Sequence, residues 1–548
     1  PSESTLNSPL WNHVPCEGNF DAIDSMPLAG CGINSSFPTV KDVYVRDRHL
    51  WSKCLHMVTS RLASAIQEGS LMEVERMLKW WMLLPRLLLR SPAGQGRRRT
   101  RMHKVHNRLC CFAQGHYGLL LKNLDADQRK KQQRAAAKRS TSQSMHRNKI
   151  ISRAMLLAQE LQYSKAIALL LSNGIADLDN FLIIDQLRLK HPLRKKGLRE
   201  YPSGNYNRLD VNVEKTIRNL ASHKAADICG WRNEFLIRSA QDPNYGQGIC
   251  QHLTVLVDYF IYGDMPDHMK TALNVGLLMG LKKKPDPIPL PENHVPAVRP
   301  IVIGGLLANL MSTTVATTCK DSLREILEPL NMAATKGGIE MVVLTLKEFL
   351  WHHQNSGNLS SKNLIMACID ARNFYNSVEL GGEFGALEVI DKEFDGKMRD
   401  MIPACMALGE FGAPLYHRSK DGTFQLCDFM SETGWRQGNA ISMAGAVLSF
   451  HPLLIKANAI LKENNLPGIL RAFADNVYMI GSVANIYKAI DFLSNEMSSK
   501  LNISLNPAES VVYAPDTVSV DTREAAFSMA LEPSVSLLAV QCAAMTPR

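Results

Sequence analysis

The sequence predicts an α+β fold in which helices pack behind an antiparallel sheet. Two short apolar runs read as buried strands, "AVRPIVIG" (297–304) and "NLIMACID" (363–370). A third segment, "GILRAFADNVYMIG" (468–481), is apolar on both sides of an acidic turn and reads as a hairpin. The longer run "ISMAGAVLSFHPLLIKANAILKENN" (441–465) predicts a helix with a kink at Pro452. Mixed α/β patterning of this kind begins at about residue 210.

The N-terminal residues, 1 to about 45, are rich in Ser, Pro, Gly and Asn and predict an extended arm that needs a partner to become ordered. The 12 cysteines of the chain are scattered and form no CxxC pair, which favours reduced thiols in an intracellular protein. Zinc-binding residue types near the N-terminus match no zinc-finger spacing, so free or buried thiols are the better interpretation for His13, Cys16, Cys31, Cys54 and His56.

Helical spacing of apolar residues extends from Arg46 to about Leu89 and predicts helices there. A basic segment follows, and "RKKQQRAAAKRSTSQSMHRNK" (129–149) is either a helix that forms on RNA or a mobile linker. Helical patterning resumes at 151–174, with Gly174 as the expected C-cap.

The positive charge of the chain is concentrated in one segment. The formal net charge is +10, and residues 97–149 contain fifteen Lys and Arg against only Asp125 and Asp127. Such clusters bind nucleic acid by releasing counterions from phosphates. A solvated tail without a partner is the alternative. The residues expected to contact RNA are Arg97, Arg98, Arg99, Arg101, Lys104, Arg129, Lys130, Lys131, Arg134, Lys138 and Arg139.

No apolar run reaches the roughly 18 residues of a membrane span, so we expect a soluble protein without a membrane partner. The chain begins at Pro1 and not at a methionine, which is compatible with a removed targeting peptide. We therefore favour the mitochondrial matrix over the nucleus.

Two acidic residues stand where strands end. Asp370 closes the strand 363–370, and Asp475 lies at the tip of the predicted hairpin. Nucleotidyl transfer needs carboxylates that converge from separate strands on two Mg²⁺ ions. Asp is also common in hairpin turns, so this pair alone is weak evidence for a metal site.

The order of several segments resembles that of reverse transcriptases, most closely those of non-LTR retrotransposons. "ACIDARNFYNSVE", "GWRQGNAISMA", "FADNVYMIG" and "LNISLNPAESVVY" are similar to motifs A to D of that family. Upstream, "KAADICGWRNEFL", "LKKKPDP" with "AVRPIVIG", and "AATKGGIE" are similar to its fingers segments and the lead into the palm. The resemblance covers about residues 150–545. It implies the fingers and palm of a right-hand polymerase, preceded by a helical, basic extension.

The resemblance implies five residues of a nucleotide site. Lys284 and Arg299 would hold the triphosphate, Gln437 and Gly438 would line the template-nucleotide pocket, and Tyr375 would exclude a 2′-hydroxyl. Without the resemblance, Arg299 reads as a surface ion pair, Tyr375 as a core ring, and Gln437 and Gly438 as a helix entrance.

The catalytic set implied by the resemblance is incomplete. Asp370 and Asp475 would be Mg²⁺ ligands, but Asn476 replaces the second carboxylate of the family's "ADD" signature. Glu509 stands where the family has a lysine that donates a proton to pyrophosphate, and an ionised carboxylate cannot donate. Ala539 and Ala543 replace glycines of the primer grip. The chain ends at Arg548, before a thumb, so we expect that domain to be absent.

These departures predict a degenerate reverse transcriptase domain that acts as an RNA-binding structural subunit of a ribonucleoprotein, such as a mitochondrial ribosome. Its partners would be structured or ribosomal RNA and other proteins of the assembly. No cofactor would be required, and Mg²⁺ would bind only if activity or nucleotide binding remains. The alternatives are an active RNA-directed DNA polymerase and a protein scaffold that binds no nucleic acid.

The predicted organisation has five parts. An N-terminal extension spans 1–149 and is basic from residue 97, and a helical lead-in follows at 150–215. The fingers-like region is 216–350, the palm-like region is 351–515, and 516–548 form a tail with the degenerate primer grip.

Overall fold

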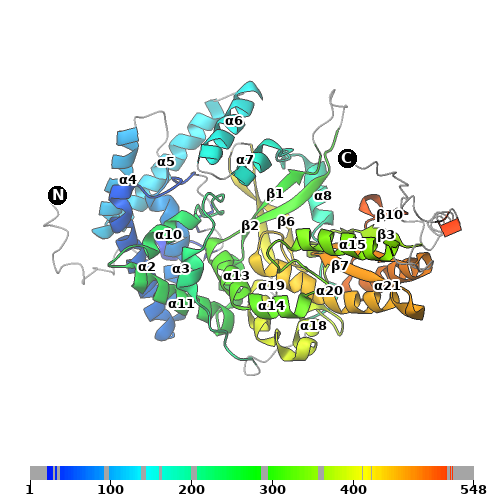
Figure 1. The fold of residues 1–548 in the computed structure, drawn as a ribbon. Helices are drawn as coiled ribbons and strands as arrows, with labels where there is room; N and C mark the ends of the chain where they lie inside the picture. The colour runs from blue at the N-terminus through cyan, green and yellow to red at the C-terminus, as the bar shows by residue number, and fades with distance from the viewer. Residues whose placement is uncertain are drawn as a thin grey trace.

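The structure is a computed structural model. It describes residues 21–28, 31–33, 37–91, 98–137, 143–159, 163–198, 206–284, 294–355, 363–409, 412–420, 422–514, 519 and 521–522. The described part is α+β, as the sequence predicts, with a helical N-terminal half and sheets confined to the C-terminal half (Figure 1). The predicted primer-grip residues Ala539 and Ala543 lie outside the described residues, as do His13 and Cys16.

Helices form the whole N-terminal half of the described chain because apolar residues recur there at helical spacing. Two long helices, α2 (Arg48–Gln67) and α3 (Leu71–Leu88), confirm the prediction for 46–89. The other helices of this half are α1 (Asp21–Asp24), α4 (Arg98–Ala113), α5 (Tyr117–Ala137), α6 (Gln143–Gln159), α7 (Tyr163–Leu170), α8 (Phe181–Leu189), α9 (Val213–Arg218), α10 (Asn233–Ala240), α11 (Gly246–Tyr262) and α12 (Asp267–Leu273).

The described residues of the predicted N-terminal arm, 21–28, 31–33 and 37–45, pack against the rest of the chain without a partner, so the prediction was wrong for them. Ile23, Phe37 and Val40 are buried in the main core. The Val40 N–H donates a hydrogen bond to the Leu89 carbonyl at 2.9 Å, and the Thr39 hydroxyl donates one at 2.8 Å to the Gly230 carbonyl. The arm is ordered because its few apolar residues pack against helices of the same chain.

The predicted C-terminal end of the helix at 151–174 was also wrong. Helix α7 ends at Leu170, and Gly174 has a φ of +88° beyond that end. The Lys282 N–H donates to the Gly174 carbonyl at 3.1 Å, and the Ala176 N–H donates to the Gly280 carbonyl at 2.8 Å. Gly174 therefore leads the chain onto a strand edge, and does not cap the helix.

The first sheet has the strand order β2-β1-β5-β6 among the described residues. Its strands are β1 (Gly276–Lys282), β2 (Val298–Gly304), β5 (Ala413–Arg418) and β6 (Phe424–Ser431). Strands β1 and β2 pair antiparallel, β1 and β5 parallel, and β5 and β6 antiparallel. Strand β2 confirms the prediction from "AVRPIVIG".

The second sheet has the order β10-β3-β8-β7 and is antiparallel throughout its described pairs. Its strands are β3 (Ile365–Ile369), β7 (Ile469–Phe473), β8 (Asn476–Gly481) and β10 (Val511–Tyr513). Strand β3 and the β7–β8 hairpin confirm the two remaining strand predictions. A short pair, β4 (Ala371–Arg372) with β9 (Ser504–Leu505), continues from the end of β3.

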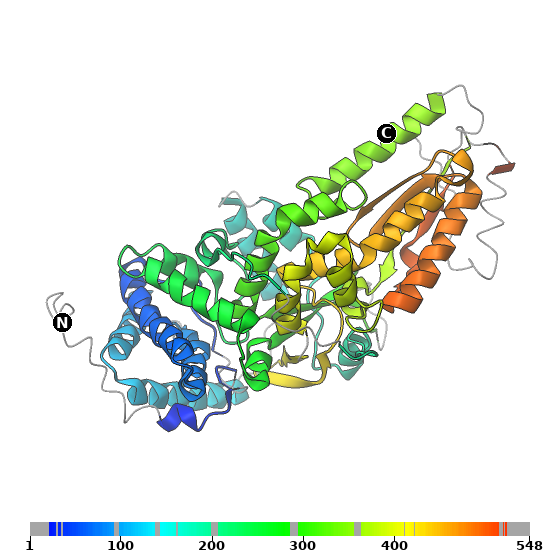
Figure 2. The same cartoon turned by 90° about the horizontal axis from the view of Figure 1, so that it is seen from below.

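Successive side chains along each strand point to opposite faces of the second sheet, and each face packs against a different core. Ala367, Val477 and Met479 belong to the main core, beside helices α20 (Ala440–Ile460) and α21 (Val483–Leu501). Met366 and Ile480 join a smaller cluster with α15 (Gly338–Asn355). Figure 2 shows α20 and α21 side by side, and α15 running past the sheet.

The remaining helices connect the two sheets: α13 (Leu306–Thr318), α14 (Lys320–Leu327), α17 (Phe374–Ser377), α18 (Ala386–Lys392) and α19 (Ile402–Gly409). Helix α20 contains Pro452 and is, among the described residues, the helix long and apolar enough to cross a membrane. Most of it is buried inside the protein, which is the position of a core helix.

Candidate functional site

Asp475 occupies a two-residue turn that a buried asparagine holds in place. The turn joins β7 to β8, and its first residue, Ala474, has a left-handed φ of +56°. This conformation costs a residue with a Cβ roughly 1–3 kcal/mol. The side chain of Asn331 compensates: its Nδ2 donates to the Ala474 carbonyl at 3.1 Å, and its Oδ1 accepts from the Ala474 N–H at 3.3 Å. Asn331 thus sets where the Asp475 carboxylate lies.

Asp370 follows β3 and is bound on both sides by the loop around 506–510. Asn506 donates from Nδ2 to Oδ2 of Asp370 at 2.7 Å and from its backbone N–H to the Asp370 carbonyl at 2.8 Å. The Asp370 N–H donates to the Ser510 hydroxyl at 3.1 Å, and that hydroxyl donates to the Asn506 carbonyl at 2.8 Å. The sequence "LNPAES" supplies all of these groups.

The structure brings the two predicted carboxylates within electrostatic reach of each other. Burial raises the pKa of Asp475 above its usual range, and the negative charge of Asp370 raises it further. Burial also raises the pKa of Asp370, while the hydrogen bond from Asn506 opposes this shift. Neighbouring Asn476 is the first residue of β8, opposite Phe473, and is half-buried.

Glu509 adds a third carboxylate to this cluster, and Lys283 neutralises it. The Nζ of Lys283 lies 2.9 Å from Oε1 of Glu509. This hydrogen bond lowers the pKa of Glu509, and the positive charge of Arg299 acts in the same direction. Glu509 is therefore ionised at neutral pH, so it accepts hydrogen bonds and cannot serve as a proton donor.

The predicted triphosphate residues lie in different environments. Arg299 is exposed on β2, and its charge lowers the pKa of both Asp475 and Glu509. Lys284 is exposed beyond the end of β1. Sequence reasoning missed the preceding residue, Lys283, which makes the ion pair, and it also missed Lys190. The Lys190 ammonium donates to the Val298 carbonyl, and burial together with the charges of Lys283 and Arg299 lowers its pKa.

Tyr375 is packed close to the carboxylates. Burial raises the pKa of Tyr375 to about 12, and the negative charge of Asp475 contributes to this shift. The Tyr375 carbonyl accepts a hydrogen bond from the Trp435 N–H at 2.6 Å. The ring is thus both a partly buried packing residue and a neighbour of the acidic cluster.

Gln437 and Gly438 form a turn that presses against β2. The Val302 N–H donates to the Gln437 carbonyl at 3.1 Å. Gly438 has a φ of +126°, and a Cβ there would lie 2.3 Å from the Val302 carbonyl oxygen, so only glycine fits. The turn leads directly into α20, beginning at Ala440.

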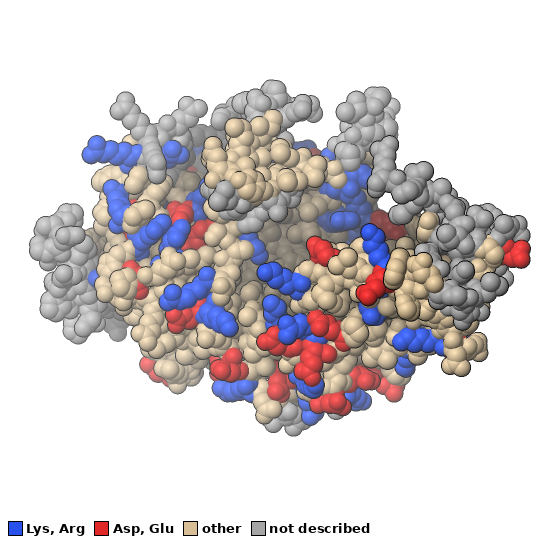
Figure 3. Space-filling view, in the orientation of Figure 1, with Lys and Arg blue, Asp and Glu red and all other residues tan. Residues whose placement is uncertain are grey.

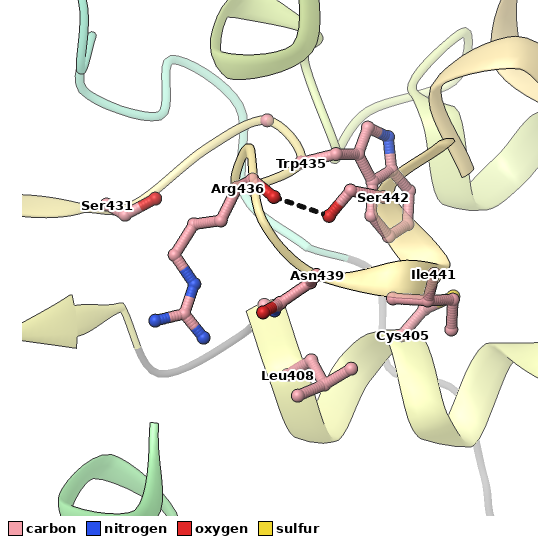
Figure 4. A pocket seen from close by; sticks show the side chains of 10 residues that line it. Cys405, Leu408, Ser431, Trp435, Arg436, Asn439, Ile441 and Ser442 are labelled. Carbon is pink, nitrogen blue, oxygen red and sulfur yellow. Dashed lines mark hydrogen bonds between the residues drawn. The ribbon is translucent and has the colours of Figure 1, made fainter. Parts of the chain in front are cut away.

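The small pocket behind this turn does not have room for a nucleotide. It encloses about 20 Å³, which is space for about one water molecule. Figure 4 shows the Arg436 side chain pointing away from Trp435, and the Ser442 hydroxyl donating to the Arg436 carbonyl at 2.7 Å. Arg436 is buried, and its Nη1 donates to the Asn274 carbonyl at 2.6 Å. These groups brace the turn.

The basic segment is a folded surface over its described part. Apolar residues of α4 and α5, including Val105, Leu109 and Leu120, are buried in the main core. The outer faces expose Arg99, Arg101, Lys104, Arg129 and Lys130. We call these five residues the α4–α5 basic surface. Figure 3 shows Lys and Arg side chains over these helices.

Asp127, one of the two acidic residues in this basic segment, forms an ion pair with the buried Arg90. Arg90 Nη2 lies 2.9 Å from its carboxylate. The described residues 98–130 are folded, because α4 packs against α2 and α3, and α5 packs against α3 and α4. The alternative of a solvated segment without a partner stays a prediction. The side chains of Arg98, Lys131 and Arg134 lie outside the description, although their backbones belong to α4 and α5, and Arg97, Lys138 and Arg139 lie wholly outside it.

The thiols near the N-terminus pack as core residues where they are described. Cys31 and Cys54 are buried free cysteines, and burial raises the pKa of Cys31 to about 12. Within the described ranges, no group of three or more His, Cys, Asp or Glu side chains is arranged to hold a metal ion. Asp370 and Asp475 influence each other only through an electrostatic interaction, and one oxygen of Asp370 is already bonded to Asn506.

Comparison with protein-family models and with curated proteins gives no match to this chain.

Proposed function

We propose that this chain is an RNA-binding structural subunit of a ribonucleoprotein, built on a reverse transcriptase-like domain that does not catalyse nucleotidyl transfer. The observation that carries this proposal is the charge balance at the carboxylate cluster. Three carboxylates, those of Asp370, Asp475 and Glu509, interact electrostatically with three cations. The cations are Lys190, Lys283 and Arg299.

A formal charge near zero is a poor environment for two divalent cations. A two-metal site works because excess negative charge holds both ions a few ångströms apart. Here Glu509 binds Lys283, so that cation is not available to a triphosphate. The ionised Glu509 would also repel pyrophosphate. With Asn476 in place of a carboxylate, the cluster supports a role other than catalysis.

The likeness to a polymerase palm has architectural support. An antiparallel sheet carries Asp370 at the end of β3 and Asp475 in the adjacent β7–β8 turn, with α20 and α21 on one face. The turn at Gly438, in the proposed palm-like region, lies against β2 of the proposed fingers-like region.

RNA is the proposed partner because the α4–α5 basic surface presents its cations on rigid helices. Helices that are already folded need no backbone ordering when their exposed cations bind phosphates. The acidic residue Asp127 on α5 is already paired with Arg90, so it does not neutralise the cations of this surface. We propose a large assembly, with a mitochondrial ribosome as the specific candidate. Sequencing of RNA and mass spectrometry of proteins that copurify with the native chain would identify it.

Salt-dependent RNA binding tests the proposal. We would replace the α4–α5 basic surface with five glutamines and measure the affinity for a single-stranded RNA by fluorescence anisotropy across a salt series. The slope of log affinity against log salt should become shallower by about 3.5, at roughly 0.7 for each phosphate contact.

A matched control removes the same charge from other exposed positions, Lys215, Lys320, Lys347, Lys456 and Lys462. This control should keep the parent slope. Equal slopes for both variants and the parent, or affinity indifferent to salt, would contradict the proposal and favour a protein scaffold that binds no nucleic acid.

An active RNA-directed DNA polymerase is the second candidate, favoured by the electrostatic effect of Asp370 on Asp475. Primer extension with Mg²⁺ or Mn²⁺ separates the two candidates. We expect no template-dependent incorporation. Incorporation that Asp370→Ala abolishes would establish the polymerase and overturn the structural role.

A further inference from the structure

A second pocket, far larger than the one behind the Gly438 turn, lies between the N-terminal helices and the first sheet. It encloses about 740 Å³, within the range of pockets that hold small molecules. Its apolar wall includes Leu156 of α6, Leu178, Leu278 and Met279 of β1, and Phe424 of β6. The site therefore draws on segments far apart in the sequence, among them Asp227, Arg232 and Glu234 of the segment "KAADICGWRNEFL".

Basic side chains dominate the polar lining of this pocket. Six are cationic, Lys41, Arg86, Arg153, Arg232, Arg238 and Arg418, against the three acids Asp42, Asp227 and Glu234. All three acids are already engaged. Glu234 accepts a hydrogen bond from the His223 N–H. Asp42 accepts a two-pronged interaction from Arg238, with the shortest distance 2.8 Å. Asp227 accepts hydrogen bonds from the backbone N–H groups of Cys229, Trp231 and Leu306.

Arg86 is a buried cation whose hydrogen bonds all go to neutral groups. Only 2% of its surface is exposed. Its Nη1 donates to the carbonyls of Gly32 and Ile33, and its Nε has no hydrogen-bond partner among the described residues. Burial lowers the pKa of Arg86 to about 10, the negative charge of Asp227 opposes this shift, and the positive charge of Arg418 adds to it. An anion in the pocket would add a hydrogen-bonded counterion for Arg86 and would offset the repulsion between Arg86 and Arg418.

Arg232 repeats this pattern on another wall of the same pocket. Its Nη1 donates to the Lys224 carbonyl at 3.0 Å, while its buried Nε lacks a partner within the described part of the chain. Arg153 and Arg418 are exposed at the pocket. Guanidinium groups match phosphate oxygens with two parallel hydrogen bonds, so four arginines suit a phosphorylated ligand better than a carboxylate of single charge.

An aromatic ring lies beside one of these cations. The Arg86 guanidinium lies 5.1 Å from the centroid of the Phe424 ring. Aromatic rings and guanidinium planes are the surfaces on which unstacked bases pack in single-stranded RNA. The remaining apolar wall would cover the rest of a base and sugar.

We propose that this pocket binds a nucleoside phosphate, either as a free nucleotide or as an unpaired nucleotide of an RNA strand, through Arg86, Arg153, Arg232 and Arg418. The phosphate contacts the arginines, and the base lies against Phe424 and the apolar wall. This site is separate from the carboxylate cluster and from the α4–α5 basic surface, so it does not rest on the function proposed for either.

Equilibrium binding to the full chain tests the proposal, by calorimetry with ADP, AMP, pyrophosphate, decyl phosphate and a ten-nucleotide oligoadenylate. We expect ADP or the oligonucleotide to bind at least tenfold more tightly than pyrophosphate or decyl phosphate. Tight binding of ADP identifies a free nucleotide as the ligand, and tight binding of the oligonucleotide alone identifies RNA.

Variants then assign the binding to the pocket. Arg153→Gln and Arg418→Gln change exposed residues and should each weaken binding about tenfold, the effect of one charge-assisted contact. Arg372→Gln, exposed on β4 away from the pocket, should leave the affinity unchanged. Arg86→Lys keeps the charge but loses the planar fork, and its thermal melting shows whether the fold survives.

Several results would overturn the proposal. These are no binding of ADP, AMP or the oligonucleotide at millimolar concentration, pyrophosphate binding as tightly as ADP, tighter binding of decyl phosphate than of AMP, or affinities that Arg153→Gln and Arg418→Gln leave unchanged. Loss of binding in these variants with intact binding of long RNA by the α4–α5 basic surface would separate this site from the one under Proposed function.

Discussion

Substitution of Gly438 by alanine is expected to loosen the turn that carries Gln437. Two effects act together at this position. The φ of +126° is strained for any residue with a side chain, and the new Cβ would meet the Val302 carbonyl oxygen at 2.3 Å. Backbone atoms on β2 cannot rotate away from this contact as the end of a side chain could.

The magnitude follows from these two costs. The backbone conformation costs about 1–3 kcal/mol, and forcing a methyl group into a filled space costs about 1–3 kcal/mol more. We therefore expect the local free energy of unfolding to fall by about 4 kcal/mol. Gly69→Ala is the matched control, because Gly69 has a φ of +71° but no heavy atom within 4 Å of its Cβ position. It should cost only about 1–2 kcal/mol.

Hydrogen exchange measures this difference locally. The Val302 N–H donates to the Gln437 carbonyl, so peptides covering 298–304 and 434–441 report on the turn. A difference of about 3 kcal/mol corresponds to roughly 100-fold faster exchange in Gly438→Ala than in the control variant. Equal protection of these peptides in both variants would refute the close approach of the turn to β2.

Four further substitutions test the cluster and the core. Asn331→Ala removes the two hydrogen bonds that hold Ala474 in its left-handed conformation, and calorimetry should show a loss of about 2 kcal/mol; an unchanged melting temperature would mean that the hairpin holds itself. The pKa of Asp475 is higher in the folded state than in the unfolded state, so the folded state binds the Asp475 proton more tightly. Stability is therefore lost as pH rises from the unfolded-state pKa through the folded-state pKa. Asp475→Asn should therefore melt higher than the parent at pH 7.5, with a gain of about 1 kcal/mol that shrinks toward pH 4, and a lower melting temperature would contradict this. Asn476→Asp adds a negative charge beside Asp475, so the variant should melt at a lower temperature than the parent without divalent cations and recover with Mg²⁺. A melting temperature that does not respond to Mg²⁺ would mean that the new carboxylate lies away from the cluster. Burial lowers the pKa of His451 to about 4, so stability is lost as pH falls from about 6.5 toward 4, and this loss should be smaller in His451→Gln.

Local pattern was sufficient for the strands and helices whose apolar residues follow one clear period. "NLIMACID" and "GILRAFADNVYMIG" predicted β3 and the β7–β8 hairpin, because alternate residues must face a core on each side of the sheet. The positions of Asp370 and Asp475 at the strand ends followed from the same patterns. Strands β5 and β6 were not predicted, because residue type and burial disagree in them: polar His417 is buried, whereas apolar Leu426 and Met430 are exposed.

Contacts between distant segments decided the rest. Lys284 was expected at the site, but the ion pair to Glu509 uses Lys283, since the end of β1 fixes which lysine reaches a loop more than two hundred residues away. The N-terminal arm became ordered because α3 and the 227–231 turn offered it a core, which composition alone does not reveal.

By itself, the sequence determined the α+β class and the concentration of positive charge in 97–149, since both depend on residue type and spacing along the chain. Only the tertiary structure decided that cations balance the carboxylate cluster, and that arginines from separate helices and strands meet in one pocket. The physical reason is that electrostatic interactions act through space. Their strength depends on distance and burial, and neither is encoded by neighbouring residues.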